Sequence, residues 1–342
     1  MNEQRLIFTD SQKKLLSLLA DGKFHSGTVL ANTLNISRSA IWKQIESLSS
    51  EYGVEIIAVS GKGYKLNRPL ELLSETQIKS GLSQQSAELL SNLEIYQQID
   101  STNRYLVERA QTATASGLVC FAESQTAGKG RRGRQWVSPF GSNIYLSILW
   151  RFQNDPASIS GLSLAVGVAV IRALRELGLI DIGLKWPNDI YWQQKKLGGI
   201  LIEVSGEAGG SCSAVIGLGL NLYLPEKETA SITQPWVDLE QIRTASPLKE
   251  SQSYTRNHIS SLLLNHLLPV IAHFETDTLQ QYLSEWRSYD VMLEKEVSIY
   301  IGNQAIDGIV KGINDDGMLL LQNNAGELKT YASGEVSFRA SL

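Results

Sequence analysis

Residues 118–150 read LVCFAESQTAGKGRRGRQWVSPFGSNIYLSILW, and this stretch decides between the folds that the rest of the chain allows. A strand-like apolar run (118–122) leads into a loop, residues 128–134, in which three glycines separate four cations. The glycines match the G-x-G-x-x-G of a dinucleotide fold, but that motif requires a helix to begin there. Trp136 follows instead, before another strand-like run (143–150), so the stretch is not a Rossmann turn. The sequence also lacks the Gly-Lys-Ser/Thr of a P-loop.

The loop at residues 128–134 indicates a site for a polyanion. Its cations repel one another, while its glycines allow the backbone to approach phosphate closely and the guanidinium fork matches phosphate oxygens. We therefore expect the free loop to be mobile and to become ordered around its ligand. A solvated basic loop and a second contact with DNA remain as alternatives.

Two further polar clusters follow the same body of the chain. Residues 185–189 (KWPND) precede a hairpin that returns with Lys196 before two glycines and an apolar strand. Lys196 is therefore expected to lie opposite a carboxylate or a phosphate. Residues 100–103 (DSTN) precede an amphipathic helix and offer both donors and acceptors for a neutral polar ligand. Taken alone, the first cluster is only a turn and the second only a helix cap.

Residues 1–66 are predicted to form a winged helix-turn-helix. Three helical runs are separated at residues 21–22 and at Asn35, and a strand-like pair joined by residues 61–63 (GKG) forms the wing. The third helix begins with the short polar and basic side chains that reach base edges. The candidate DNA contacts are Ser37, Arg38, Ser39, Lys43 and Gln44 on this helix, and Lys62 and Lys65 on the wing. A protein-docking module with a charged face is the alternative.

Composition limits the remaining possibilities. The chain has 342 residues, so we expect two or three domains. Its net charge of −4 argues against a protein that coats nucleic acid with its whole surface. Residues 1–66 hold eight Lys/Arg against six Asp/Glu, which leaves the acidic excess in the body. The chain has only two cysteines, and we found neither a signal-like start nor an apolar run of membrane-spanning length. These features predict a cytoplasmic protein without a disulfide framework, a zinc cluster or a membrane partner.

The rest of the chain divides into two regions. Residues 67–287 begin with a linker-like Asn-Arg-Pro and mix helical and strand-like runs, which predicts a mixed α/β domain. Residues 288–342 show short apolar alternations between regular turns, which predicts a small β-barrel. The predicted fold class is therefore α+β and multidomain. The runs expected in the body are helices at 165–177 and 258–273 and strands at 118–122, 143–150, 200–204 and 214–218.

The ordered set of motifs resembles the biotin protein ligase family, in the bifunctional form that also represses the biotin operon. The resemblance covers nearly the whole chain, and each motif alone is common whereas the ordered set is specific. It rests on DSTN (100–103), GKGRRGR (128–134), KWPND (185–189), KLGGIL (196–201), GLN (219–221) and, in the head, GKGY (61–64). It implies a class II synthetase-like ligase domain followed by a C-terminal SH3-like barrel.

The resemblance implies an enzyme that converts biotin and ATP, with Mg²⁺, into biotinyl-5'-AMP and pyrophosphate. The biotin would then be transferred to one lysine of the biotin carboxyl carrier protein of acetyl-CoA carboxylase. The adenylate would also act as a corepressor that promotes homodimerisation and binding to the biotin operator. Two alternatives are a ligand-sensing regulator without catalysis and a lipoate-type ligase; the winged head and the arginine loop argue against the second.

The resemblance also implies roles for individual residues and assigns no metal ligands. The catalytic residues would be Lys196, which bonds the biotin carboxylate and the phosphate bridge, Arg131 and Asp189, the candidate proton acceptor in the transfer step. The biotin site would comprise Ser101, Thr102, Asn103, Gln125, Lys129, Gly130, Arg131 and Lys196. The ATP site would comprise Arg131, Arg132, Arg134, Lys185, Asn188, Asn221 and Trp236.

One residue departs from the family pattern. The family's loop usually reads Gly-Arg-Gly-Arg, and here Lys129 replaces the first arginine. Lysine keeps the positive charge but loses the two-pronged fork of the guanidinium. The expected effect is on how tightly the closed loop holds the intermediate, and not on the reaction class.

Overall fold

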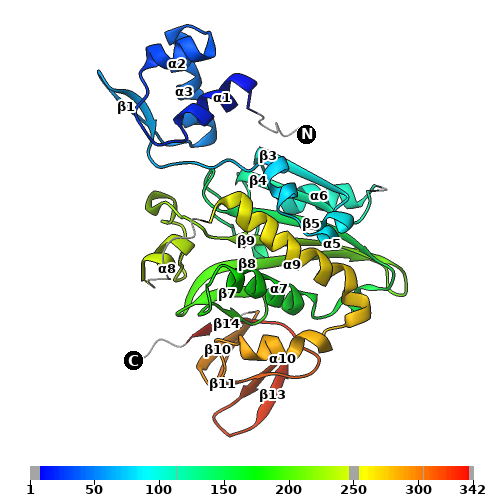
Figure 1. Cartoon of the computed structure of the whole chain (residues 1–342). Helices are drawn as coiled ribbons and strands as arrows, with labels where there is room; N and C mark the ends of the chain where they lie inside the picture. Colours follow the sequence, from blue (N-terminus) through cyan, green and yellow to red (C-terminus); the bar gives the residue numbers. More distant parts are fainter. Residues whose placement is uncertain (1–7, 113, 246–253, 303, 339–342) are drawn as a thin grey trace.

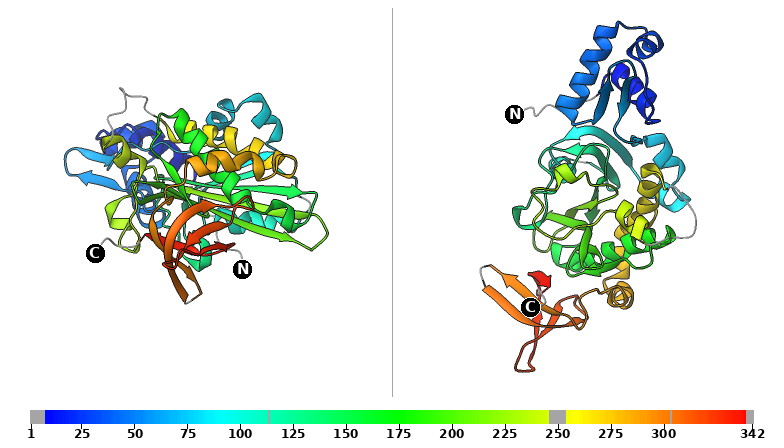
Figure 2. Two further views of the ribbon diagram at one scale, coloured as in Figure 1. Left: turned by 90° about the horizontal axis from the view of Figure 1, so that it is seen from below. Right: turned by 90° about the vertical axis from the view of Figure 1, so that its left-hand side faces the viewer.

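The computed structural model describes residues 8–112, 114–245, 254–302 and 304–338, which form three units in chain order (Figure 1). The N-terminal unit lies at one end of the molecule, a seven-stranded sheet with its helices forms the middle, and a five-stranded sheet lies at the other end. Figure 2 shows this arrangement from two further directions. The predicted α+β, multidomain fold class is confirmed.

The N-terminal unit is the predicted helix-turn-helix with a two-stranded wing. The hydroxyls of Ser26 and Ser37 cap the second and third helices by accepting hydrogen bonds from the N–H groups of Val29 and Ala40 (3.1 Å each). Asn35 adopts a left-handed φ of 53° and turns the chain between these helices. The elements are α1 (Asp10–Leu19), α2 (Gly27–Leu34), α3 (Arg38–Tyr52), β1 (Ile56–Val59) and β2 (Gly63–Leu66).

The head packs directly on the body, although residues 67–69 were expected to act as a linker. Arg68 donates to the hydroxyl of Ser142 (2.7 Å), on the segment that follows the glycine–arginine loop. Phe140 of that segment joins the core of the head, with ring centroids 5.5 Å from Phe8 and 6.3 Å from Tyr52. The head and body therefore share apolar contacts, and the domain borders at residues 66 and 287 remain predictions.

The middle unit is a mixed seven-stranded sheet in the order β3-β4-β5-β9-β8-β7-β6. Strands β3 and β4 are parallel, and the other pairs are antiparallel. The predicted strands and helices of the body are all found, with bounds a few residues longer or shifted. The strands are β3 (Asn92–Ile99), β4 (Leu118–Gln125), β5 (Ile144–Phe152), β6 (Gly183–Lys185), β7 (Asp189–Trp192), β8 (Lys195–Gly206) and β9 (Cys212–Leu220). The helices are α4 (Glu75–Ser80), α5 (Gln84–Leu89), α6 (Thr102–Ala110), α7 (Leu162–Glu176), α8 (Leu239–Ala245) and α9 (Arg256–Asp277).

The two faces of this sheet have different cores, because successive residues of a strand point to opposite sides. Phe121 of β4 is buried in the large cluster that contains α7 and α9, whereas Cys120 is buried in a smaller cluster with α6. On β9, Val215 belongs to the α6 side, and the next two residues on that side are Gly217 and Gly219. The α6 face therefore has no apolar filling at these two positions, and this is where the pocket lies.

One segment is apolar and long enough to cross a membrane by length and composition, namely Pro156–Glu176. No apolar run of this length was expected from the sequence, because Arg172 interrupts the stretch. Most of the segment is α7, and 67% of its most apolar window is buried within the fold. It is the central helix of the core that covers one face of the sheet.

The C-terminal unit follows α10 (Gln280–Ser288) and consists of five antiparallel strands in the order β13-β12-β11-β10-β14. The first of them, β10, lies at 296–301, where the short apolar alternation was predicted. Val297 and Ile299 of β10 point inward and are fully buried, while Ser298 and Tyr300 point outward. The strands are β10 (Glu296–Ile301), β11 (Gln304–Ile313), β12 (Leu319–Gln322), β13 (Leu328–Tyr331) and β14 (Glu335–Phe338).

Candidate active site

The pocket is open on the α6 face of the sheet because β9 carries glycine there. A Cβ atom at Gly217 would lie 2.1 Å from Oδ1 of Asn103, and one at Gly219 would lie 2.4 Å from the ring of Trp136. Glycine alone leaves room for these two side chains against the sheet. We call the pocket-facing residues of β6, β7, β8 and β9 the floor, and residues 128–136 the lid.

The start of α6 forms a polar end of the pocket. Ser101 is the N-cap of the helix, as its position predicted. Thr102 donates two hydrogen bonds to Oε1 of Gln125, from its N–H (2.9 Å) and from its hydroxyl (3.1 Å). Gln125 in turn donates to Ser138 (3.1 Å). These bonds fix the orientation of the Gln125 amide before any ligand arrives.

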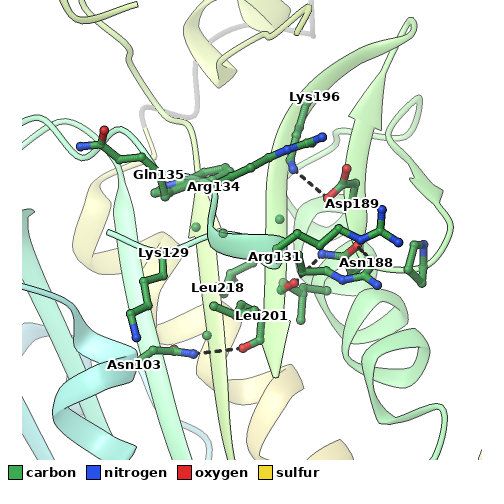
Figure 3. A pocket seen from close by; sticks show the side chains of 18 of the residues that line it. Asn103, Lys129, Arg131, Arg134, Gln135, Asn188, Asp189, Lys196, Leu201 and Leu218 are labelled. Carbon is green, nitrogen blue, oxygen red and sulfur yellow. Dashed lines mark hydrogen bonds and ion pairs between the residues drawn. The ribbon is translucent and has the colours of Figure 1, made fainter. Parts of the chain in front are cut away.

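Asn103 is fixed in the same way. Its Nδ2 donates to a carboxylate oxygen of Glu203 (2.8 Å) and to the carbonyl of Leu201 (3.3 Å), and its Oδ1 accepts from the hydroxyl of Ser147 (2.6 Å). Figure 3 shows Asn103 and Leu201 at one end of the pocket. The side chain is 4% exposed, so its polar atoms are held in a buried network.

The floor carries two lysines with little solvent access. Lys196 forms an ion pair with Asp189 (Nζ–Oδ1 2.8 Å), and the two side chains are 14% and 16% exposed. Lys185 donates to the hydroxyl of Tyr191 (3.0 Å) and is 8% exposed. Burial lowers the pKa of the Lys185 ammonium, because the charged form loses water, while the charge of Asp189 opposes this shift. An arriving anion would stabilise both ammonium groups.

The lid is a short turn closed by its own backbone. The N–H of Trp136 donates to the carbonyl of Gly128 (2.8 Å), and the N–H of Gly130 donates to the carbonyl of Arg134 (2.7 Å). Arg132, at the tip, adopts a left-handed φ of 57°. This geometry directs several cations away from the turn and toward neighbouring elements.

Arg131 points from the lid to the floor. Its Nη1 donates to Oδ1 of Asn188 (2.8 Å), as Figure 3 shows. Partial burial lowers the pKa of the Arg131 guanidinium, with the nearby Asp189 acting in the opposite direction. The amide of Asn188 is itself fixed, because its Nδ2 donates to the carbonyl of Ile200 (2.6 Å).

The other two lid arginines contact the C-terminal sheet. Arg132 donates to the carbonyl of Tyr300 on β10 (3.3 Å) and lies 3.9 Å from a carboxylate oxygen of Glu335 on β14. Arg134 forms an ion pair with the same carboxylate. The side chains of Arg132 and Arg134 are 40% and 56% exposed, so they retain donors for a ligand. The C-terminal unit therefore completes the wall of the pocket.

The pocket has a strong excess of positive charge. Cations in a partly desolvated cleft attract an anion far more strongly than the same charges in water. The cationic lining residues are Lys129, Arg131, Arg132, Arg134, Lys185 and Lys196, and the lining carboxylates are Asp189 and Glu335. The arrangement can therefore bind a ligand with several negative charges next to a neutral polar group.

Asn221 and Trp236, the remaining predicted ATP residues, line a second cavity that adjoins the first. The two cavities share Arg134, Lys185 and Lys196. Trp236 pairs with Lys196 in a parallel β-bridge, and the buried Asn221 donates to the carbonyl of Val237 (3.2 Å). The structure thus places the predicted ligand-binding residues around two connected cavities.

Several lining residues had no local signal in the sequence. Trp136 was noted only as the end of the loop, Glu335 lies 201 residues from the arginine that it binds, and Tyr191 lies within an ordinary strand. Glu203, which holds Asn103 from outside the pocket, also lies within an ordinary strand. Among the described residues, no group of three or more His, Cys, Asp or Glu side chains could hold a metal ion.

The predicted DNA contacts are divided by the structure. Ser37 is the cap of α3, and its hydroxyl lies 2.8 Å from that of Ser39. Gln44 points into the head: its Nε2 donates to Ser11 (2.7 Å), and its Oε1 is buried without a partner among the described residues. The amide of Gln44 is therefore not available to a base edge, whereas Lys43 is exposed.

The wing lysines share one aromatic support. The ammonium groups of Lys62 and Lys65 lie 5.9 and 5.1 Å from the ring centroid of Phe24. Cation–π contacts hold both charges on the same side of the wing. This favours a contact with a phosphate backbone beside α3.

A winged helix-turn-helix joined to a sheet with a cationic pocket defines a DNA-binding protein that also contains an enzyme-like site for an anion. Residues 95–221 match the biotin/lipoate A/B protein ligase family, residues 11–65 match a helix-turn-helix domain, and residues 292–339 match the biotin protein ligase C-terminal domain. The bifunctional ligase/repressor BirA of Escherichia coli (strain K12) is 40% identical over 328 residues, which cover 96% of this chain and 97% of that protein.

A second bacterial relative and a solved structure point to the same family. BirA of Bacillus subtilis (strain 168) is 30% identical over 325 residues, covering 94% of this chain and 97% of that protein. The biotin protein ligase from Aquifex aeolicus, solved in complex with biotin and ATP, superimposes with a TM-score of 0.59 at 28% identity and covers 74% of this chain and all of that one. The chain belongs to the biotin protein ligase family, in its bifunctional ligase–repressor group.

Proposed function

We propose that this chain forms biotinyl-5'-AMP and pyrophosphate from biotin and ATP, and then transfers biotin to a lysine of the biotin carboxyl carrier protein of acetyl-CoA carboxylase. One observation carries the proposal: fixed amides, a half-buried Lys196–Asp189 pair and the lid arginines line a single pocket. The relative from Aquifex aeolicus was solved with these two substrates.

The polar end would bind the ureido ring of biotin. That group is neutral and has both donors and acceptors, and Ser101, Thr102, Asn103 and Gln125 offer both kinds of partner in fixed orientations. Trp136 adds an indole N–H that is buried without a partner among the described residues. Lys129 and Gly130 of the lid would close over the ring and the tail.

The opposite end would bind ATP. Arg131, Lys185 and Asn188, which line the pocket, would surround the α-phosphate, and Arg132 and Arg134 of the lid would face the outer phosphates. Asn221 and Trp236 would contact the nucleoside in the adjoining cavity. Two arginines that already hold a carboxylate in the free protein are suited to phosphate, because both anions accept a pair of parallel hydrogen bonds.

Mg²⁺ would bind with the nucleotide. It prefers oxygen ligands and is usually held by one or two carboxylates together with phosphates and water. Asp189 and Glu335 are the carboxylates that line the pocket, so the donor set fits an ion held mainly by phosphate. The ion supplies charge that neutralises the β- and γ-phosphates.

In the first step, a carboxylate oxygen of biotin attacks the α-phosphorus of ATP, and pyrophosphate leaves. Two anions must approach each other, so fixed cations are needed at the point of attack. Lys196 is held in place by Asp189 and would contact both the biotin carboxylate and the α-phosphate. Arg131 would hold the same phosphate from the lid.

In the second step, a neutral lysine amine of the carrier protein attacks the biotinyl carbonyl, and AMP leaves. Asp189 is the carboxylate closest to Lys196 and would accept the proton of the attacking amine. The mixed anhydride is destroyed by water, so a lid that closes over it protects it between the steps.

We further propose that the adenylate-bound protein is a cytoplasmic homodimer that binds the biotin operator through its two heads. A helix-turn-helix dimer reads two half-sites related by two-fold symmetry. We propose the cytoplasm as the location because ATP, the carrier protein and operator DNA occur together there. Sedimentation should show a dimer with biotin and ATP and a monomer without them; a monomer under both conditions would contradict the proposal.

Exchange of labelled pyrophosphate into ATP tests the ligase proposal. Biotin should support exchange, and lipoate should not. Thermal unfolding provides a second readout, because a ligand that binds the folded state raises the melting temperature. Biotin-independent exchange, or a larger thermal shift with lipoate than with biotin, would overturn the assignment of the polar end.

A further inference from the structure

The third helix of the head exposes a large aromatic side chain that the proposed DNA contacts do not include. Trp42 lies in the second turn of α3 and is 52% exposed. Among the described residues, no other tryptophan is exposed to this degree. Ile41, Ile45 and Leu48 bury one side of the helix, and Trp42 lies roughly a quarter turn around the helix axis from this buried side.

The position of Trp42 coincides with the part of a recognition helix that reaches base edges. Residues four apart share a helix face, which places Trp42 beside Arg38 and Lys43 beside Ser39. These four residues form the outward surface of the first two turns, and we call them the reading surface. Glu46, one turn after Trp42, adds a negative charge that would face phosphate unfavourably. DNA contact is therefore restricted to the start of the helix, where recognition helices make it.

The polar members of the reading surface are partly occupied by the protein itself. Ser39 shares a hydrogen bond with the capping residue Ser37. Gln44 lies outside the reading surface, because its amide is turned toward Ser11. The wing lysines over Phe24 can position the head on phosphates but carry little sequence information. Arg38 and Lys43 can contact phosphate or guanine, and neither cation recognises a thymine methyl. Trp42 is the large apolar group of this surface, and thymine presents the matching apolar group, a C5-methyl, in the major groove.

We propose that Trp42 is a specificity-determining residue that contacts a thymine methyl in the major groove of the operator. This inference rests on the proposed repressor function and adds the base that the helix prefers. Its occupant is duplex DNA, because Arg38 and Lys43 flank the indole with positive charge. If the reading surface of a second copy docked here, its positive charges would be repelled by Arg38 and Lys43.

The test begins with duplexes selected from a randomised library by the full-length protein in the presence of biotin and ATP. Trp42→Ala should weaken binding to the selected duplex about tenfold and should abolish the preference for thymine at one position of each half-site. Uracil at that position removes only the methyl group and should weaken the wild-type protein about fourfold, the factor that one buried methyl is worth. The same exchange should not affect Trp42→Ala.

Two controls separate this inference from the repressor function. Lys43→Ala should weaken all duplexes to a similar degree and reduce the salt dependence of binding, as expected for a phosphate contact. Trp42→Ala should leave biotin-dependent pyrophosphate exchange and the melting temperature unchanged. If Trp42→Ala bound and selected DNA like the wild type, the role of Trp42 would be overturned. The same holds if Trp42→Ala bound DNA more weakly only because it no longer formed the dimer. If the wild type selected no duplex, the repressor function itself would be wrong.

Discussion

The floor and the lid contribute cations to the same pocket in different ways. Lys185 and Lys196 of the floor are buried on hydrogen-bonded strands and are held by Tyr191 and Asp189. The lid arginines are more exposed and bind acceptors on other elements, as Arg134 does at Glu335 of the C-terminal sheet.

This difference indicates which part of the site exists before the ligand. The floor is positioned by the ladders of a sheet, so its geometry is independent of substrate. The acceptors that hold the lid are a side-chain amide, a carbonyl and a carboxylate, which are the kinds of oxygen that phosphate can replace. We therefore expect the floor to govern chemistry and the lid to govern retention of the intermediate.

The largest effect is expected at the centre of the floor. Lys196→Ala removes the cation between the two reacting anions and should reduce biotin-dependent pyrophosphate exchange on the order of 10²–10³-fold. Lys195→Ala, a change of the exposed neighbour, should leave exchange unchanged. Near-wild-type exchange in Lys196→Ala would show that the floor cation is not used in the chemical step.

A glycine of the floor should matter almost as much. Gly217→Ala places a methyl group 2.1 Å from Oδ1 of Asn103 and must displace an amide held by three hydrogen-bond partners. The KM for biotin should rise about a hundredfold, because the polar site loses its fixed geometry. Gly210→Ala, in the open hairpin tip, is the matched control. An unchanged KM in Gly217→Ala would place the ureido group elsewhere.

The contact between the lid and the C-terminal sheet should have a smaller effect. Glu335→Gln removes the charge that positions Arg132 and Arg134, and exposed ion pairs contribute little. We expect the KM for ATP to rise about two- to fivefold while the KM for biotin stays constant. Glu327→Gln makes the same charge change at an exposed turn of that sheet and serves as the matched control. A lower KM for ATP in Glu335→Gln would mean that the carboxylate competes with phosphate.

A buried carboxyl beside the floor should make stability depend on pH. Asp290 bridges to Leu184 of β6, and burial raises the pKa of its carboxyl to about 6 from 3.8. The folded state therefore binds more protons between these values, and stability falls as pH rises through this window. Asp290→Asn should stabilise the protein by about 3 kcal/mol near pH 7 and not below about pH 4. Thermal melts at both pH values check this, and equal shifts at both would contradict it.

The smallest effect is expected from the unusual lysine of the lid. Lys129→Arg restores the fork that the family usually has at this position, without a change in charge. The adenylate should dissociate about twofold more slowly, and the rate of its formation should not change. Chase experiments with unlabelled adenylate measure this rate, and a changed rate of formation would assign Lys129 to the chemistry.

The features that could be predicted from the sequence are local in the chain. The features that could not be predicted depend on contacts between residues far apart in the sequence. Glycines and cations that alternate within residues 128–134 are visible in any reading of the chain, and so are the serines that cap α3 and α6. Glu335 could not be found, because its partner is far away in the sequence and strand β14 has an ordinary composition. The same reason explains why Phe140 was not predicted to enter the core of the head.

The orientation of side chains on the third helix was harder to predict. Gln44 was placed on the DNA-binding side from composition alone, but the helix phase turns it toward Ser11 of α1. Trp42 was not among the predicted DNA contacts, although its side chain is exposed beside them. A helical wheel anchored on Ile41 and Ile45 places Gln44 and Trp42 at similar angles on either side of the buried face, so only the packing against α1 distinguishes the two orientations.

Amide hydrogen exchange tests the comparison of floor and lid most directly. Exchange is followed at residues 128–136 and at residues 183–221, in the free protein and with biotin and ATP together. The floor should be protected in both states, and the lid should slow by about tenfold or more only when both ligands are bound. Equal protection of the lid in the two states, or a floor that gains protection only with ligand, would contradict the account.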